Sequence, residues 1–341
     1  MSPRRESLLL HAHSKPLLSA DAIVRPGIGQ VTLETPDFLC EIGGVGAGRL
    51  ARILPALDGG RTIAELAADE HLSAAAMLRS LEPLADVGAL IDIAAPFEEI
   101  GDLEFMDRVM QECRLRTRAL FQQPFWQRLS AGSLPPPVVL GWGIEFAHFV
   151  ESANAYMPLG IASCRAGAAM REAFARHYVE EAQHSEFFFA GLVRCGLRRS
   201  RLEAAPPLAS TRALVNQLCE FAMMGAAPYA ACFAVMQPTQ EPADAGQVTA
   251  FFQDLRELYP FAAPLFDAFE GHAKIDIELG HEVTLFERLC RTGGLDAGER
   301  RIVLQVVASL VESFTLFFEG ILDSYSKPGV AVPRRPVVIG V

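Results

Sequence analysis

The pattern of hydrophobic and polar positions divides the chain into a short mixed part and a long helical part. Between residues 30 and 42, apolar and polar side chains alternate in two runs separated by Thr35 and Pro36, which predicts two antiparallel strands. Helical periodicity follows over three segments, residues 47–57, 62–68 and 73–87. An alternating run over residues 89–93 predicts a closing strand. Strands, three helices and a final strand together predict a small winged-helix α+β domain over residues 21–96.

Local signals support these helices. Thr62 and Glu65 have the spacing of a capping box, and Ser73 can cap the third helix. The glycine-rich run at residues 43–48 lacks the spacing of a phosphate-binding loop, so we interpret it as a turn.

From residue 97 onward the pattern is helical throughout. After a linker helix over residues 97–123, long helical stretches are predicted over residues 138–158, 167–195, 211–236, 247–258, 262–292 and 297–325. Proline- and glycine-containing segments separate several of them. We therefore expect a mostly α protein with a helical bundle over residues 124–326. Residues 1–20 and 327–341 are expected to be loose tails.

Composition narrows the class of protein. The 341-residue chain is half hydrophobic and carries a formal charge of −11, which argues against nucleic acid and anionic membranes as partners. Its seven cysteines form no CxxC motif, which indicates reduced thiols in the cytoplasm. His11 and His13 interrupt the first apolar run, so no signal peptide is expected. The uncharged run 221–240 contains Gly225 and Pro228 and is expected to be a buried core helix.

Carboxylate–histidine pairs are the most informative feature of the helical part. Three stretches place the two residue types about one turn apart, and five of the eight histidines lie in or beside them. Glu181 and His184 are about 60° apart on an ideal helix, and His177 lies one turn before Glu181. Such pairs hold two metal ions in the cores of helical bundles, and Fe(II) and Mn(II) accept this mixture of ligands.

Other candidates are less regular. Glu145 and His148 lie among aromatic residues. They could bind metal directly or hold the metal ligands in place. Glu220 precedes an apolar run and is the only carboxylate between Glu203 and Glu241, so a ligand role is favoured.

The last candidate helix poses a problem of register. His272 and Asp276 share one face, but His281 falls on the opposite side of an ideal helix. A π-bulge near Gly280 would bring His281 back to the Asp276 face. Alternatively, Glu278 and His281 form the operative pair.

The part from about residue 124 to 325 resembles the heme-oxygenase-like di-metal oxidases and oxygenases, relatives of PqqC and TenA. The resemblance rests on four segments, residues 123–125, 180–184, 207–211 and 272–281. It implies two Fe(II) ions, with manganese as the alternative, and O2 as co-substrate with an external electron donor. The implied ligands are Glu181, His184, Glu220, His272, Asp276 and His281. A ferritin-like di-iron pattern also fits, with Glu145, Glu181 and His184, Glu220, and Glu278 and His281.

Residues 25–93 resemble the PqqD-like recognition element of enzymes that tailor ribosomally made, modified peptides (RiPPs). Residues 57–67 and 81–90 carry the similarity. Such elements bind a leader peptide as an added strand, here at an edge from residues 30–42 beside helix 73–87.

These features lead to one main hypothesis and two alternatives. We expect a cytoplasmic, homodimeric di-iron oxidoreductase of natural-product biosynthesis that oxidises a precursor peptide or a carrier-bound substrate. The first alternative is a PqqC-like cofactor-free oxidase, in which the histidines act as acids and bases. The second is a non-catalytic leader-peptide-binding protein. Heme binding ranks last, because no histidine stands out as an axial ligand.

Overall fold

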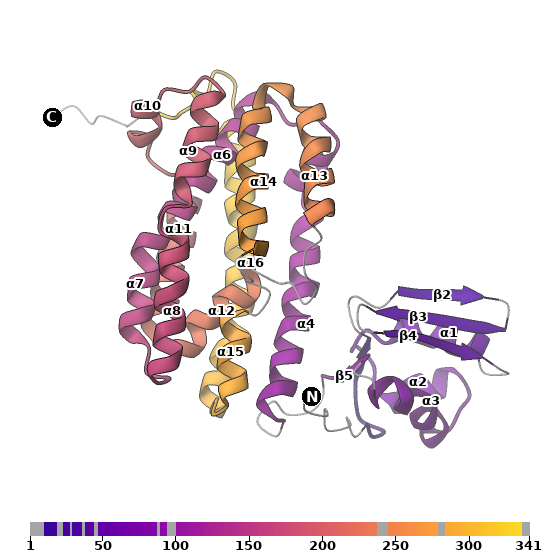
Figure 1. The fold of residues 1–341 in the computed structure, drawn as a ribbon. Helices are drawn as coiled ribbons and strands as arrows, with labels where there is room; N and C mark the ends of the chain where they lie inside the picture. The colour runs from indigo at the N-terminus through magenta and orange to yellow at the C-terminus, as the bar shows by residue number, and fades with distance from the viewer. Residues whose placement is uncertain are drawn as a thin grey trace. The chain divides into compact units, whose positions relative to one another are not determined.

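The structure is a computed structural model (Figure 1). It describes residues 10–18, 23–27, 29–35, 38–43, 47–86, 89–93, 100–236, 245–278 and 284–335. The chain folds into two compact units, Met1–Gln111 and Glu112–Val341. Each unit is described by itself below.

The first unit contains two small antiparallel sheets. Strands β2 (Ile23–Gly27), β3 (Gln30–Thr35) and β4 (Phe38–Gly43) pair in that order, with Val31 opposite Ile42. The two strands predicted between residues 30 and 42 are therefore confirmed. Strand β1 (Pro16–Leu18) pairs with β5 (Leu90–Asp92). The expectation of a loose tail over residues 1–20 is thus wrong for residues 16–18, which gain backbone partners far away in the chain.

Three predicted helices follow the sheet. They are α1 (Ala47–Ile53) with the 3-10 turn η1 (Leu54–Ala56), α2 (Ile63–Asp69) and α3 (Ala74–Asp86). The capping box is present, since Thr62 Oγ1 accepts from the Glu65 amide and the Glu65 carboxylate accepts from the Thr62 amide. Ser73 Oγ likewise accepts from the Ala76 amide. These helices and β3 bury one apolar core, which includes Leu33, Leu54, Ile63 and Leu81.

Helix α4 (Asp102–Phe121) matches the predicted linker helix in position. The boundary between the two compact units falls within it, between Gln111 and Glu112. The residues that precede it, 94–99, lie outside the described part of the chain.

The second unit is a bundle of helices that run roughly along one axis (Figure 1). Its elements are α5 (Pro124–Ser130), α6 (Pro136–Glu151), α7 (Ala153–Ser163), α8 (Ala168–Glu181), α9 (Ser185–Arg194), α10 (Arg199–Glu203), α11 (Ala209–Met224), α12 (Ala226–Met236), α13 (Ala245–Leu258), η2 (Pro260–Ala262), α14 (Ala263–Glu278), α15 (Leu285–Thr292) and α16 (Ala297–Tyr325). The predicted mostly α fold is confirmed.

Several helices predicted as continuous are interrupted. The stretch 211–236 breaks at Gly225, whose φ of 127° lies in a region that glycine adopts readily. The stretch 167–195 breaks at Ala182–His184, where the backbone makes a turn. No glycine or proline marks that second break, so the sequence pattern did not reveal it. Its position matters because one candidate metal ligand, Glu181, directly precedes the break and another, His184, is its last residue.

The bundle core forms where α6, α9 and α14 pack together, and where α16 packs on α6, α11 and α12. Aromatic residues fill much of the space: Trp142 stacks on Phe269 at 4.4 Å and meets Phe125 edge-on at 5.6 Å. Helix α12 is buried along most of its length. The prediction that the uncharged run is a buried core helix is confirmed over this helix.

One helix of the described chain, α16, has the length and apolar composition to cross a membrane. Core helices of bundles meet the same two criteria. Its buried side chains include Val307, Leu310 and Phe317, and it packs against four helices of its own unit, α5, α6, α11 and α12. We therefore interpret α16 as a core helix.

Candidate metal centre

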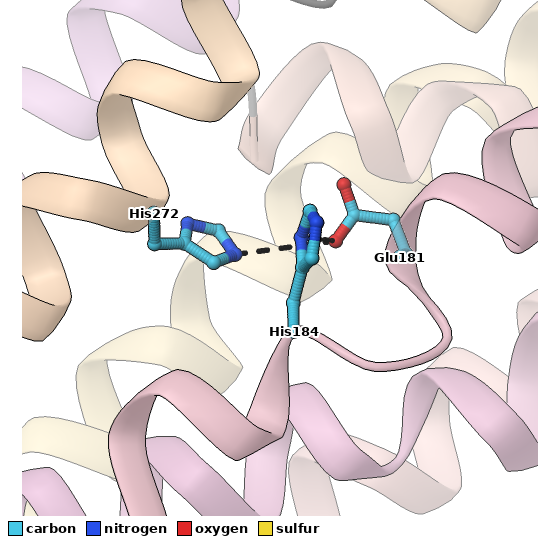
Figure 2. Close-up of side chains that lie close together, drawn as sticks. All are labelled: Glu181, His184 and His272. Carbon is cyan, nitrogen blue, oxygen red and sulfur yellow. Dashed lines mark ion pairs between the residues drawn. The ribbon is translucent and has the colours of Figure 1, made fainter. Parts of the chain in front are cut away.

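Three predicted ligands converge from two separate parts of the bundle. Glu181 is the last residue of α8, and His184 is the last residue of the three-residue turn and immediately precedes α9. His272 lies on α14, which packs along α9. Figure 2 shows the His272 ring pointing from α14 toward the other two side chains. The break after α8 therefore places Glu181 and His184 at adjoining helix ends that both face α14.

The spacing of these side chains suits one metal ion. Nδ1 of His184 lies 2.9 Å from Oε2 of Glu181, and Nε2 of His272 lies 4.0 Å from the same oxygen. One ligand atom from each residue falls within 4.8 Å of the others. Two ligand atoms that are each bonded to one metal ion at about 2.1 Å lie about 3 Å apart when the two bonds form a right angle. They lie about 4.2 Å apart when they are on opposite sides of the ion. The two measured distances lie at or between these limits.

Asp276 orients one of the histidines. Its Oδ2 lies 3.2 Å from Nδ1 of His272, one helical turn away on α14. A neutral imidazole that donates its Nδ1 proton to this carboxylate presents the Nε2 lone pair toward Glu181, an arrangement typical of metal-bound histidines. His272 Nε2 is buried and has no hydrogen-bond partner in the described chain. A buried acceptor aimed at a carboxylate fits a bound cation, so the residues present suit the metal.

Electrostatics keep the Glu181 carboxyl ionised. Burial favours the neutral form of Glu181, but the imidazoles of His177 and His184 outweigh it and lower the pKa of this carboxyl. In turn, the Glu181 carboxylate raises the pKa of His184 against the effect of burial. A metal ion at this position would replace the proton that the carboxylate otherwise attracts to His184.

A comparison with protein families gives the centre its context. Residues 140–310 match the family model described as iron-containing redox enzyme. The chain belongs to this family. The matched segment contains all three clustered side chains, and their mixture of imidazole and carboxylate is one that iron accepts.

One solved structure supports the heme oxygenase-like fold of the chain. A domain of unknown function with a heme oxygenase-like fold, from Shewanella denitrificans OS217, aligns with a TM-score of 0.53 at 15% identity, covering 67% of this chain and 94% of that one. A TenA homologue from Pyrococcus furiosus aligns with a TM-score of 0.44 at 15% identity, covering 64% and 99%. A comparison with curated proteins finds no significant match.

Not every predicted ligand of the iron-containing redox enzyme joins the cluster. Glu220 is exposed on α11, so the premise that it is a buried lone carboxylate is wrong. His148 lies on α6 near Phe189 and Glu151 and lines a separate cavity of about 530 Å³. His281 and the side chain of Glu278 lie outside the described residues, as does the predicted π-bulge near Gly280. The two alternative registers of the last helix therefore stay predictions.

Glu145 has partners of a different kind. It is fully buried, and its Oε2 accepts hydrogen bonds from the Leu208 amide at 2.8 Å and the Thr211 hydroxyl at 2.6 Å. Its Oε1 accepts from the Tyr325 hydroxyl at 2.8 Å. Both oxygens are thus engaged by α11 and α16, and Glu145 joins those helices to α6. This arrangement differs from the ligand role that the ferritin-like pattern gives to Glu145.

The sequence contains one indirect signal that a buried acceptor such as Glu145 joins α6 to α11. Helix α11 starts after Pro206 and Pro207 with Leu208 at its N-cap, and leucine has no side-chain acceptor for the first amides. A helix that starts without a local cap needs an acceptor from elsewhere when its end is buried. Glu145 supplies an acceptor from α6 for the Leu208 amide, although sequence spacing alone does not identify which carboxylate does so.

Proposed function

We propose that the chain is an O2-dependent non-heme di-iron oxidase or oxygenase. Two Fe(II) ions, with manganese as the alternative, would be held at a centre built around Glu181, His184 and His272. The observation that supports the proposal most is the buried cluster itself, in which a carboxylate and two imidazoles approach within 4.8 Å of one another. Membership in a family of iron-containing redox enzymes agrees with the choice of metal.

Bound ferrous iron would supply the electrons and the binding position for O2. The chain's own residues prepare the site for it. Glu181 is held as the anion, and the Asp276 carboxylate fixes the ring of His272 so that Nε2 faces the centre. Phe188 is fully buried and packs 5.2 Å from the His272 ring, which limits the access of water on that side. The exclusion of water from an active site prevents side reactions of reactive oxygen species.

The proposed substrate is a RiPP precursor peptide or a carrier-bound natural product recognised by the first unit. Support comes from the sheet order, in which β4 lies at an edge, and from Leu39, which is 62% exposed on that strand. An edge strand offers unpaired backbone groups to an extended peptide, and an exposed apolar side chain adds a contact for the peptide's own side chains. The homodimeric state and the cytoplasmic location stay predictions.

Oxygen uptake tests the enzymatic part of this proposal. The full chain, loaded anaerobically with Fe(II) and given a reductant, should consume O2 at a rate that rises when the correct precursor peptide is added. The Glu181→Ala variant should lose this activity. Uptake of equal rate in metal-free wild type would support the cofactor-free oxidase instead.

Peptide binding is tested separately. Fluorescence anisotropy with labelled precursor peptides should report binding by the full chain, and Leu39→Glu should weaken it. The Glu181→Ala variant serves as the matched control and should bind peptide as wild type does. Peptide binding in the absence of any metal-dependent oxygen uptake would favour the non-catalytic binding protein.

A further inference from the structure

The two oxygens of the Glu181 carboxylate face different histidines. Oε2 is the atom that lies near His184 and His272. Oε1 lies 3.6 Å from Nε2 of His177, which precedes Glu181 by one turn on α8. The carboxylate therefore lies between two groups of imidazole nitrogens. A carboxylate with donor groups on both sides is the arrangement that bridges paired metal ions.

The distance on the His177 side also suits a shared ion. Hydrogen bonds between nitrogen and oxygen usually measure about 2.7–3.2 Å, so 3.6 Å is long for a direct bond. Two ligands bonded at about 2.1 Å to one ion lie 3.6 Å apart when the angle between the bonds is about 120°. That angle falls within the range that open metal sites use. The gap therefore matches two ligands of a common ion.

Packing holds the His177 ring in this orientation. His177 is 5% exposed, and its ring meets Phe233 of α12 edge-on at 4.6 Å. Phe233 is in turn held by Tyr229, with ring centroids 5.2 Å apart. The His177 ring therefore has little freedom to turn its Nε2 away from Glu181. A ligand whose position is fixed before binding loses little entropy when the ion arrives.

We propose that His177 Nε2 and Glu181 Oε1 hold a second divalent cation, so that Glu181 bridges two ions. The first ion lies between Glu181 Oε2, His184 and His272. Ions bridged by a carboxylate are typically about 3.5–4 Å apart, and water or substrate completes their coordination. The inference rests on the proposed di-metal function and deepens it. It assigns to the second ion a ligand on α8 in place of Glu220, which is exposed on α11.

The test uses anaerobic Mn(II) titration of the full chain, with bound metal measured by equilibrium dialysis and by electron paramagnetic resonance. Wild type should bind two ions and show the signal of a spin-coupled pair. His177→Ala should keep the first ion with its affinity unchanged, weaken the second at least tenfold, and show an uncoupled signal. His148→Ala removes a histidine outside the cluster and should behave as wild type does.

A second variant separates binding from positioning. If His177 only orients Glu181, its removal should weaken both ions together, and His177→Gln should restore them through a hydrogen bond. Either result would overturn the inference, as would two ions of unchanged affinity in His177→Ala. His177→Asn replaces the alanine variant if that one does not fold. Failure of wild type to bind two ions would refute the proposed di-metal function itself, whereas two ions in wild type and in His177→Ala would refute only the role of His177.

Discussion

The Tyr325 hydroxyl donates a 2.8 Å hydrogen bond to Glu145 although the two residues lie 180 positions apart in the chain. The same carboxylate accepts from the start of α11 through Leu208 and Thr211. One buried side chain thus joins three helices of the bundle. Burial and the negative charge of Glu145 both raise the pKa of Tyr325, so this hydroxyl stays a donor at all ordinary pH values.

Replacing Glu145 should therefore affect stability and leave metal binding intact. Glu145→Ala leaves three buried hydrogen-bond donors without an acceptor, and each unsatisfied group costs about 1–3 kcal/mol. A loss of at least about 3 kcal/mol in unfolding free energy is therefore expected. Urea denaturation measures this loss, and Tyr325→Phe should cost about 1 kcal/mol as the matched smaller change. Loss of bound iron at unchanged stability would instead indicate the ligand role of the ferritin-like pattern.

Two helical glycines should respond to alanine in opposite ways. A Cβ on Gly141 would clash with the Tyr325 ring, whereas a Cβ on Gly271 would meet nothing within 4 Å. Gly141→Ala should destabilise the fold by about 1–3 kcal/mol through overpacking. Gly271→Ala should stabilise it by about 0.5–1 kcal/mol, because alanine favours the helix. Thermal denaturation of the metal-free proteins compares them, and equal effects would contradict the packing around Tyr325.

Acid should weaken the contact between α13 and α14. Burial opposes ionisation of Glu270, but Lys274, Arg256 and Thr249 outweigh it and lower its pKa to about 2. A carboxyl whose pKa is lowered on folding adds stability above its unfolded pKa of about 4.5, and this stability is lost as pH falls toward 2. Glu270→Gln should remove on the order of 1 kcal/mol at pH 7 and much less near pH 2. An equal difference between variant and wild type at both pH values would show that charge is not the cause.

Asp276 should act through His272 and not as an equal ligand of the first ion. It contacts Nδ1 of that ring at 3.2 Å, so its loss frees the ring to rotate but leaves Nε2 available. Asp276→Ala should weaken the first metal ion about 10–100-fold, as expected for a residue that orients a ligand. His272→Ala should abolish that site. Isothermal titration with Mn(II) compares them, and an equal loss in both variants would make Asp276 a direct ligand.

Local patterns predicted most of the secondary structure. Alternation predicted β3 and β4, and a capping box predicted the start of α2, because each signal lies within a few residues. Strand β1 was missed because its partner β5 is more than 70 residues away. The break at Ala182–His184 was missed because these residues have no intrinsic tendency to end a helix. Such features depend on packing that the local sequence does not encode.

The candidate metal centre was also predicted only in part from the sequence. Spacing identified Glu181 with His184, and the structure brings His272 to them from α14. The ligand prediction for Glu220 relied on the apolar run that follows it, but the side chain projects from the exposed face of α11. The role of Glu145 depends on Tyr325 and Thr211, whose proximity arises only from the tertiary fold.

The central claim is that Glu181, His184 and His272 bind iron. Its most direct test is the iron content of the full chain after anaerobic reconstitution with Fe(II) and removal of free metal. Wild type should retain about two iron ions per chain, as a bridged pair requires. The Glu181→Ala variant should retain almost none, because this carboxylate lies within 4.0 Å of ring nitrogens of His177, His184 and His272. Equal iron content in wild type and this variant, or none in either, would contradict the account.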